Sequence, residues 1–462
     1  MYREPASNRL IRVIDTSLFL LLCCVIVLAP VLYGSTDVPI RMILEIISFI
    51  AFGCVALISA FGRPGPGLIP LFAPVLAFTF YLFVQILPII PGQQFGGIHW
   101  RTISINPPQT TVALVEFLSL CCYGYLTLSL VNSKKRLIKL VNIIVILGFL
   151  LGLQAILQDM NSNDKLYWFR DTAYPILAYG GFVNKNHAAG YYVLPYALGF
   201  GLLLRKSIRP NRRIIYGVLT LITGVAVMLS RSRGGLVSIM VASLFMIVLN
   251  GALPREDLTG SLERGGHRWL TWKLAAAVAV FLVAIFSAAL WINNRSLDQV
   301  LLGFNKDNAL ATLGGRAEIW RSSIQMIKDR PILGSGFGTF PVNFPRFTLF
   351  DGHLTAEAAH NDYLQVLCDT GIIGAIIATV ILAVYAVNIK RALWSRAGYL
   401  GGIQLGTLGG IVAILIHSLF DFNLQIYSVA LTFSVFAVLP FCSGSDDRNR
   451  VRDQATEAAE SA

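Results

Sequence analysis

The sequence predicts an all-α membrane protein, a polytopic helical bundle of about 12 transmembrane helices with one large outer loop. Of its 462 residues 55% are hydrophobic and only 13% are charged, whereas a soluble domain carries about a quarter charged residues. The apolar residues gather in runs of about 20, the length that crosses the hydrocarbon core of a bilayer. Basic residues alternate between successive connections, and this alternation predicts the orientation of the bundle.

The predicted spans follow one another along almost the whole chain. We place them at residues 14–33, 38–61, 68–90, 109–131, 137–157, 187–204, 214–230, 234–250, 273–292, 363–389, 400–420 and 425–442. The first run is long for a signal-peptide core and no small-residue cleavage site closes it, so we expect a retained span. Residues 1–442 are therefore predicted to form a single transmembrane domain, and the polar residues 443–462 a disordered cytoplasmic tail.

The basic residues test this order of spans. With the N-terminus inside, inner segments such as 134–139 and 205–213 are rich in Lys and Arg, and the short outer connections "STDVP" and "DFNLQ" have none. The positive-inside rule then predicts that both termini are cytoplasmic. In such a protein the formal net charge of +12 indicates this asymmetry, and we predict no nucleic-acid partner.

The cysteines and histidines indicate neither a disulfide framework nor a metal site. All seven cysteines lie within or beside apolar runs, where a thiol behaves as a small core hydrophobe. No pair among the six histidines has convincing zinc spacing with a third ligand. We therefore expect no metal and no cofactor.

Two outer connections are long, residues 158–186 and 293–361. Long loops in compact membrane proteins usually carry function. The second contains "GGRAEIWRSSIQMIKDRPILGSGFGTF", whose apolar residues follow a helical period until Pro331 ends the helix. We expect this amphipathic helix to lie on the membrane surface or against the bundle.

Arginines stand at two places on the predicted outer side. Arg231 and Arg233, in "MLSRSRGGL", occupy a very short outer turn against the positive-inside bias. They could snorkel to headgroups, but we favour an anion site in which glycines allow close approach at a helix N-terminus. Arg316 opens the amphipathic helix behind two glycines, where the helix dipole disfavours a cation unless an anion lies nearby.

A histidine, an amide and a carboxylate stand together in "AAHNDYLQ", directly before the span at 363–389. Alone, His360 would be interpreted as an exposed loop imidazole, with Asn361 or Asp362 as the N-cap of the helix. Arg233, Arg316 and His360 nevertheless fall on one outer face from three distant stretches. Arginines suit a diphosphate and a histidine suits removing a proton near neutral pH, so we predict a site for a lipid diphosphate there.

Six further polar residues have no assigned role: Arg41, Glu45, Glu116, His187, His417 and Asp421. The first two are spaced i, i+4 and are expected to form a structural ion pair. The last two have the same spacing at an outer helix end and are expected to form a polar pair. The stretch "GGFVNKNHAAGYY" is expected either to cap the helix that follows it or to line a path for a sugar.

Five segments taken together resemble the O-antigen ligase and O-antigen polymerase superfamily of bacterial envelope glycosyltransferases. They are "GGFVNKNHAAGYYVLPYALG", "LSRSRGG", "GGRAEIWRSSIQMIKDRPILGSGFGTF", "AAHNDYLQVLCDTGIIG" and "HSLFDFNLQI", which cover roughly residues 180 to 430 in the order of the family. Each segment alone is loose, but five in order on the predicted sides of the membrane are specific. The first five spans carry little of this signature.

The resemblance implies a GT-C-like, metal-independent glycosyltransferase of the bacterial inner membrane. Such an enzyme transfers a glycan from undecaprenyl diphosphate to an acceptor hydroxyl at the periplasmic face. The family's diphosphate-binding arginines map to Arg233 and Arg316, with Arg231 as a secondary candidate, and its loop histidine maps to His360. The histidine would act as general base, supported by Asn361 and Asp362, and direct displacement would invert the anomeric carbon.

The acceptor stays open within the superfamily: lipid A core for a ligase, another lipid-linked repeat unit for an O-antigen or exopolysaccharide polymerase, or a protein hydroxyl. "HSLFDFNLQI" is similar to members associated with exopolysaccharide synthesis, although we place the ligase first. A transporter or flippase of lipid-linked sugars is the alternative of another class. Transporters usually place polar residues near the midplane in related halves, whereas here they gather at one face. A non-catalytic scaffold would leave the outer arginines without a purpose.

Overall fold

The computed structural model describes residues 6–60, 69–94, 97–161, 165–172, 178–205, 209–253, 255–256, 262–263, 313–348, 356–395 and 398–442. The α-helices in this part of the chain are α1 (Ala6–Val31), α2 (Val38–Ala60), α3 (Ile69–Ile86), α4 (Pro107–Leu130), α5 (Lys134–Met160), α6 (Lys185–Leu204), α7 (Pro210–Leu229), α8 (Arg233–Ala252), α11 (Leu313–Asp329), α12 (Phe340–Asn343), α13 (Asp362–Ser395), α14 (Gly398–His417) and α15 (Tyr427–Val438). Short 3₁₀ helices are η1 (Tyr33–Ser35), η3 (Phe344–Arg346), η4 (Asn423–Gln425) and η5 (Leu439–Phe441).

Within the described residues, eight helices are long and apolar enough to cross a membrane: α1, α2, α4, α5, α7, α8, α13 and α14. This confirms the predicted all-α, polytopic class. The helices α3, α6 and α15 coincide with three more of the predicted spans. The predicted span at 273–292 and the predicted tail at 443–462 lie outside the described residues, as does part of the predicted loop at 293–361.

Polar residues in the connections act as N-caps of the helices that follow them. Asn106 caps α4 by accepting a hydrogen bond from the backbone of Gln109, and a proline follows at the first helical position. Ser133 caps α5 and Ser232 caps α8 in the same way. Because four N–H groups at each helix start lack intrahelical partners, such caps fix where each span begins.

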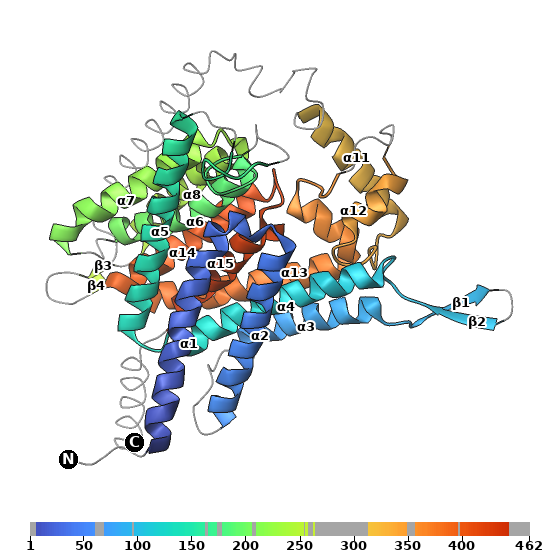
Figure 1. Ribbon diagram of the computed structural model, residues 1–462, viewed down its shortest axis with the longest axis horizontal. Helices are drawn as coiled ribbons and strands as arrows, with labels where there is room; N and C mark the ends of the chain where they lie inside the picture. The colour runs from blue at the N-terminus through green and yellow to red at the C-terminus, as the bar shows by residue number, and fades with distance from the viewer. Residues whose placement is uncertain are drawn as a thin grey trace.

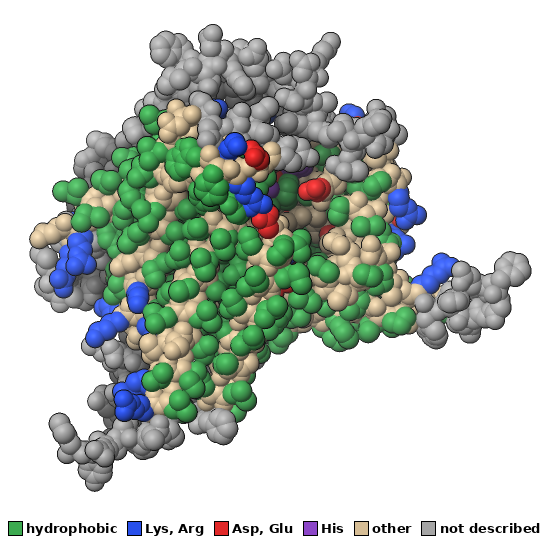
Figure 2. Space-filling model, viewed as in Figure 1, with side chains coloured by type: hydrophobic (Ala, Val, Ile, Leu, Met, Phe, Trp, Pro, Cys, Tyr) green, Lys and Arg blue, Asp and Glu red, His purple; other side chains and the backbone are tan. Residues whose placement is uncertain are grey.

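The centre of the bundle is α6, whose side chains are buried on all sides against α5, α7, α8 and α14 (Figure 1). A Cβ on Gly201 would collide with the backbone of Gly406 in α14. The two helices therefore approach closely through small residues, which is a common mode of helix packing in membranes. On the face shown in Figure 2, hydrophobic side chains cover most of the described surface of the bundle, as expected for contact with lipid.

Two small hairpins interrupt this helical architecture. Strands β1 (Ile90–Gln94) and β2 (Gly97–Arg101) pair antiparallel between α3 and α4 and project from one side of the bundle (Figure 1). Strands β3 (Arg255–Glu256) and β4 (Leu262–Glu263) form a second short pair. The all-α prediction included neither hairpin, because a short hairpin leaves little hydrophobic pattern in the sequence.

The predicted span at 363–389 is a broken helix. Within α13, Gly371 has φ 60° and ψ −165°, a conformation that essentially only glycine adopts. The loop after α11 enters this break: the N–H groups of Ser335 and Gly336 bond the carbonyls of Cys368 and Asp369, at 3.0 and 2.9 Å. The loop thus replaces the hydrogen bonds that the break removes, as buried backbone requires.

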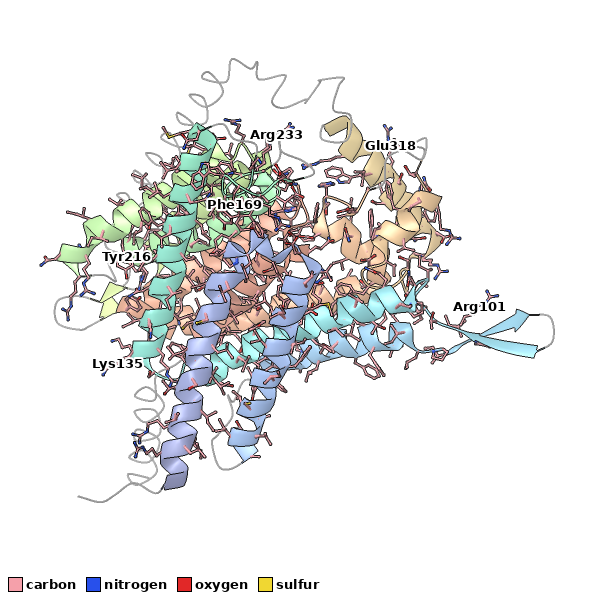
Figure 3. The ribbon with its side chains drawn as sticks, in the orientation of Figure 1. Arg101, Lys135, Phe169, Tyr216, Arg233 and Glu318 are labelled. Atoms are coloured by element: carbon pink, nitrogen blue, oxygen red, sulfur yellow. The ribbon has the colours of Figure 1, made fainter. Side chains whose placement is uncertain are left out.

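The predicted amphipathic helix forms as α11 and packs against the bundle. Its buried residues Ile319 and Met326 form a cluster with Phe340, Phe344 and Cys368, from α12, η3 and α13. Arg233 and Glu318 lie toward one end of the bundle and Lys135 toward the other (Figure 3). The basic start of α5 and the residues of the candidate site are therefore at opposite ends.

Candidate active site

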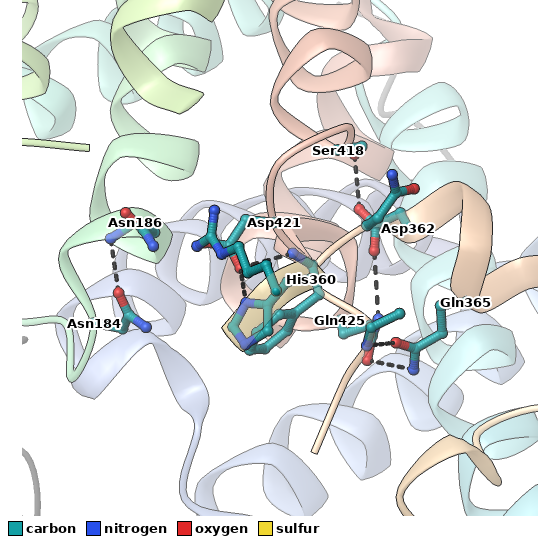
Figure 4. Close-up of polar contacts among 12 residues, drawn as sticks. Asn184, Asn186, His360, Asp362, Gln365, Ser418, Asp421 and Gln425 are labelled. Carbon is teal, nitrogen blue, oxygen red and sulfur yellow. Dashed lines mark hydrogen bonds and ion pairs between the residues drawn. The ribbon is translucent and has the colours of Figure 1, made fainter. Parts of the chain in front are cut away.

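The start of α13 is attached to the chain that follows α14. The backbone N–H of Asp362 donates to the carbonyl of Ser418 at 2.9 Å, and the Ser418 hydroxyl donates to the Asp362 carboxylate at 2.7 Å. Gln425 of η4 also reaches this carboxylate, at 3.4 Å, and accepts a hydrogen bond from Gln365 at 3.0 Å (Figure 4). Asp362 thus holds α13 against the loop between α14 and α15.

Asn361 is the N-cap of α13, one of the two residues expected to take this role. Its side-chain oxygen accepts hydrogen bonds from the backbones of Tyr363 and Leu364, at 3.0 and 3.1 Å. Its amide nitrogen donates to the carbonyl of Leu419 at 3.2 Å. The residue directly after His360 is therefore fixed both to α13 and to the chain after α14.

His360 has a strained backbone and a defined partner. Its φ is 49°, a left-handed conformation that is uncommon outside glycine and often marks functional sites. Its Nδ1 lies 3.1 Å from Oδ1 of Asp421, and its ring lies against that of Phe422 with centroids 4.9 Å apart. Trp320 of α11 donates its indole N–H to the carbonyl of Ala359, at 3.0 Å, which holds the residue before the histidine.

Asp421 is buried, with only 2% of its side chain exposed, and connects two of the predicted site residues. Its Oδ2 lies 3.6 Å from Nη2 of Arg316, while Oδ1 faces His360. Burial alone would raise the pKa of this carboxyl group. The hydrogen bond and charge of His360 and the charge of Arg316 outweigh burial and hold the pKa of Asp421 well below its usual range. Asp421 is therefore ionised at neutral pH.

The sequence spacing suggested the wrong partner for Asp421. We expected a side-chain pair with His417 from the i, i+4 spacing, but only the backbone N–H of Asp421 reaches His417, at its carbonyl. The helix α14 ends at His417, so the chain turns away and the helical spacing no longer applies to the carboxylate. An acidic residue at the start of the outer connection "DFNLQ" was the available signal, but it did not identify the partner.

The N-terminus of α8 places Arg233 beside the end of α14. Arg233 is the exposed first residue of α8, and Gly234 packs on His417, where a Cβ would lie 2.6 Å from the imidazole Cδ2. Arg231, with φ 57°, forms an ion pair with Asp159 of α5 at 3.2 Å. Of the three predicted arginines, Arg316 is thus joined to His360 through Asp421, Arg233 lies next to the end of α14, and Arg231 is paired with another helix.

The segment before α6 forms a cap, as one of the two expectations stated. The side chain of Asn184 accepts a hydrogen bond from the backbone of Asn186 at 2.9 Å (Figure 4). His187 packs against the Phe422 ring at 4.8 Å, so Phe422 contacts both His187 and His360. Figure 2 shows a hollow at this end of the molecule, bordered by histidine and acidic side chains. A path for a sugar there stays a prediction.

Comparison with known proteins supports the resemblance. Residues 218–379 match the family model described as O-antigen ligase. The matched region contains Arg231, Arg233, Arg316 and His360 and ends before Asp421. A search of curated proteins finds no match. The matched family indicates O-antigen ligase or a related polymerase activity. Residues 218–379 are therefore similar to the O-antigen ligase family, which supports the superfamily that the sequence segments resemble.

Proposed function

We propose that this protein is a membrane glycosyltransferase of the O-antigen ligase type. It would transfer a glycan from undecaprenyl diphosphate to an acceptor hydroxyl at the periplasmic face of the inner membrane. The observation that carries the proposal is the buried Asp421 carboxylate, which contacts His360 through one oxygen and Arg316 through the other. A general base and a phosphate-binding cation are the two groups that this reaction needs.

In the proposed mechanism His360 is the general base. Because Asp421 is ionised, Nδ1–H of His360 donates to it, and the lone pair of Nε2 is left to accept a proton. The acceptor oxygen attacks the anomeric carbon as its proton passes to Nε2. The bond from this carbon to the diphosphate breaks, and its electron pair leaves with the diphosphate. Direct displacement inverts the anomeric carbon, and Asp421 stabilises the imidazolium that forms.

Arg316 and Arg233 would bind the departing diphosphate. The distance of 3.6 Å between Arg316 and Asp421 is an ion pair but not a hydrogen bond, so the guanidinium keeps donors for phosphate oxygens. Arg233 stands at the N-terminus of α8, where the helix dipole also favours an anion. Two guanidinium groups would supply the charge that a metal ion supplies in other diphosphate-sugar enzymes, which makes the proposed reaction metal-independent.

The decisive experiment uses purified protein in lipid nanodiscs with an undecaprenyl-diphosphate-linked glycan. Lipid A core, a second lipid-linked repeat unit and a serine-containing peptide are offered separately as acceptors, and the product is identified by mass spectrometry. His360→Ala should lower the transfer rate by about 10²- to 10⁴-fold, the usual contribution of a general base. Arg233→Ala should lower it by about 10²-fold, whereas the matched control Arg231→Ala, which removes a guanidinium already paired with Asp159, should cost less than about 10-fold.

The acceptor that is glycosylated separates the ligase from the polymerase and from protein glycosylation. Full transfer by a folded His360→Ala variant would contradict the proposal. Movement of the lipid-linked glycan across liposomes without any new glycosidic bond would support the flippase instead.

A further inference from the structure

Three charged side chains meet between α2 and α4, away from the His360 site. Nη1 of Arg41 lies 3.4 Å from Oε2 of Glu116, and Nε of Arg41 lies 3.7 Å from Oε1 of Glu45. The i, i+4 spacing predicted the pair of Arg41 and Glu45 within α2 but no partner for Glu116; the structure joins all three. We name Arg41, Glu45 and Glu116 the α2–α4 triad.

The triad lies within the predicted membrane, and its side chains keep a small exposed fraction. Glu45 and Glu116 are seven and nine residues from the starts of α2 and α4, which is about 10–14 Å at 1.5 Å per residue. Their side chains are 12% and 19% exposed. Ile46, next to Glu45, and Val112, one turn before Glu116, are about half exposed and face the surroundings of the bundle. Ionisable groups at such a depth are costly and usually functional.

The charges of the triad do not satisfy one another. Two carboxylates share one guanidinium, and both contacts are longer than a good hydrogen bond. Oε1 of Glu45 is buried without a hydrogen-bond partner in the described part of the structure. Buried polar atoms are nearly always hydrogen-bonded, so this oxygen indicates a missing donor. The missing group is therefore a hydrogen-bond donor such as a hydroxyl or an amine, because an ionised phosphate has no hydrogen to donate.

The triad is connected to the elements that hold the candidate active site. Ser119, one turn after Glu116 on α4, shares a hydrogen bond of 2.9 Å with the hydroxyl of Tyr427, the first residue of α15. Two residues before this tyrosine, Gln425 bonds the Asp362 carboxylate at the start of α13. The triad is thus linked through α4 to the short segment from Gln425 to Tyr427, and this segment also holds Asp362 near His360.

We propose that the α2–α4 triad binds hydroxyl groups of the sugar headgroup of a lipid-anchored acceptor, which enters sideways from the bilayer. This inference rests on the proposed function and deepens it by making the acceptor an amphiphile. The carboxylates accept hydrogen bonds from neighbouring sugar hydroxyls, and the guanidinium of Arg41 donates one. The donor diphosphate is disfavoured there because the carboxyl oxygens need hydrogen-bond donors, which an ionised diphosphate lacks.

The test compares kinetics of Glu116→Gln with those of the exposed control Asp329→Asn in nanodiscs. Loss of a hydrogen bond to a charged group should raise KM for a lipid-anchored acceptor by about 10-fold or more. KM for the undecaprenyl-diphosphate donor, and KM for a soluble sugar acceptor, should not change. The control should match the wild type in all three KM values. A change confined to the donor, or no change in a folded variant, would overturn the inference.

A second variant separates binding from folding. Replacing the whole triad by leucines, Arg41→Leu with Glu45→Leu and Glu116→Leu, removes every charge and should be close to neutral for stability. It should still raise KM for the lipid-anchored acceptor; normal acceptor kinetics would show that the triad is structural only.

If the wild type transfers to no acceptor, the proposed function fails. Photo-crosslinking of a neutral glycolipid, monoglucosyl diacylglycerol, to α2 or α4 then decides the inference: labelling that Glu116→Gln abolishes supports it, and no labelling refutes it.

Discussion

Replacing Asp421 by asparagine tests the core of the candidate site, because it removes one charge and keeps the shape. The carboxylate lies 3.1 Å from Nδ1 of His360, so at an effective dielectric constant of about 20 its attraction for an imidazolium is about 5 kcal/mol. If the proton is about half transferred in the transition state, about half of this energy is lost, which corresponds to roughly 10²-fold in rate. Asparagine can also donate to Nδ1, and the resulting tautomer would carry its proton on Nε2, where the base must be free.

We therefore expect Asp421→Asn to lower kcat by about 10²- to 10⁴-fold while KM for the donor changes little. The assay is single-turnover transfer of a labelled glycan from undecaprenyl diphosphate in nanodiscs. Asp362→Asn is the matched control, since this second buried carboxylate contacts Ser418 and Gln425 but not His360. It should lower the unfolding temperature and change kcat by less than about 10-fold. A folded Asp421→Asn protein with kcat within about 3-fold of the wild type would refute the assignment of His360 as an Asp-supported base.

Three further outcomes follow from the same structure. Gly371→Ala should destabilise the protein by about 2 kcal/mol or more, measured by thermal unfolding, because its φ of 60° suits glycine and a Cβ would collide with the carbonyl of Ile332; Gly53→Ala, at an open position, should have little effect. Trp320→Phe keeps an aromatic ring but removes the indole N–H that bonds the carbonyl before His360. It should lower kcat by about 5-fold without changing either KM, and an unchanged kcat would mean that this hydrogen bond does not position the histidine. The lowered pKa of Asp421 stabilises the folded state fully above the unfolded pKa of about 3.9. The stability advantage of the wild type over Asp421→Asn should therefore shrink as the pH falls below about 3.9 toward the much lower folded pKa. An advantage that does not change with pH in this range would show that the carboxylate is not held ionised.

Much of the architecture could be predicted because its causes are local in the chain. Span positions follow from runs of apolar residues, and the amphipathic helix at α11 follows from its own period. The N-cap of α13 follows from an asparagine beside a hydrophobic run. The gathering of Arg316 and His360 was also expected, because a membrane restricts distant segments to one of two faces and so makes their meeting predictable.

Only the tertiary structure decided which side chains meet. The i, i+4 spacing pointed Asp421 toward His417, but α14 ends there and the carboxylate turns to His360 and Arg316. The break in α13 at Gly371 was hidden within an apolar run, because the partners for its free backbone groups come from the loop after α11. Hydropathy and helical period indicate which segments form helices and which of their faces are apolar. Hydrogen bonds and ion pairs between segments depend instead on how the helices pack. The sequence by itself therefore determined the class, the positions of the described spans and the predicted face of the site, and packing alone decided that a buried aspartate joins the histidine to an arginine.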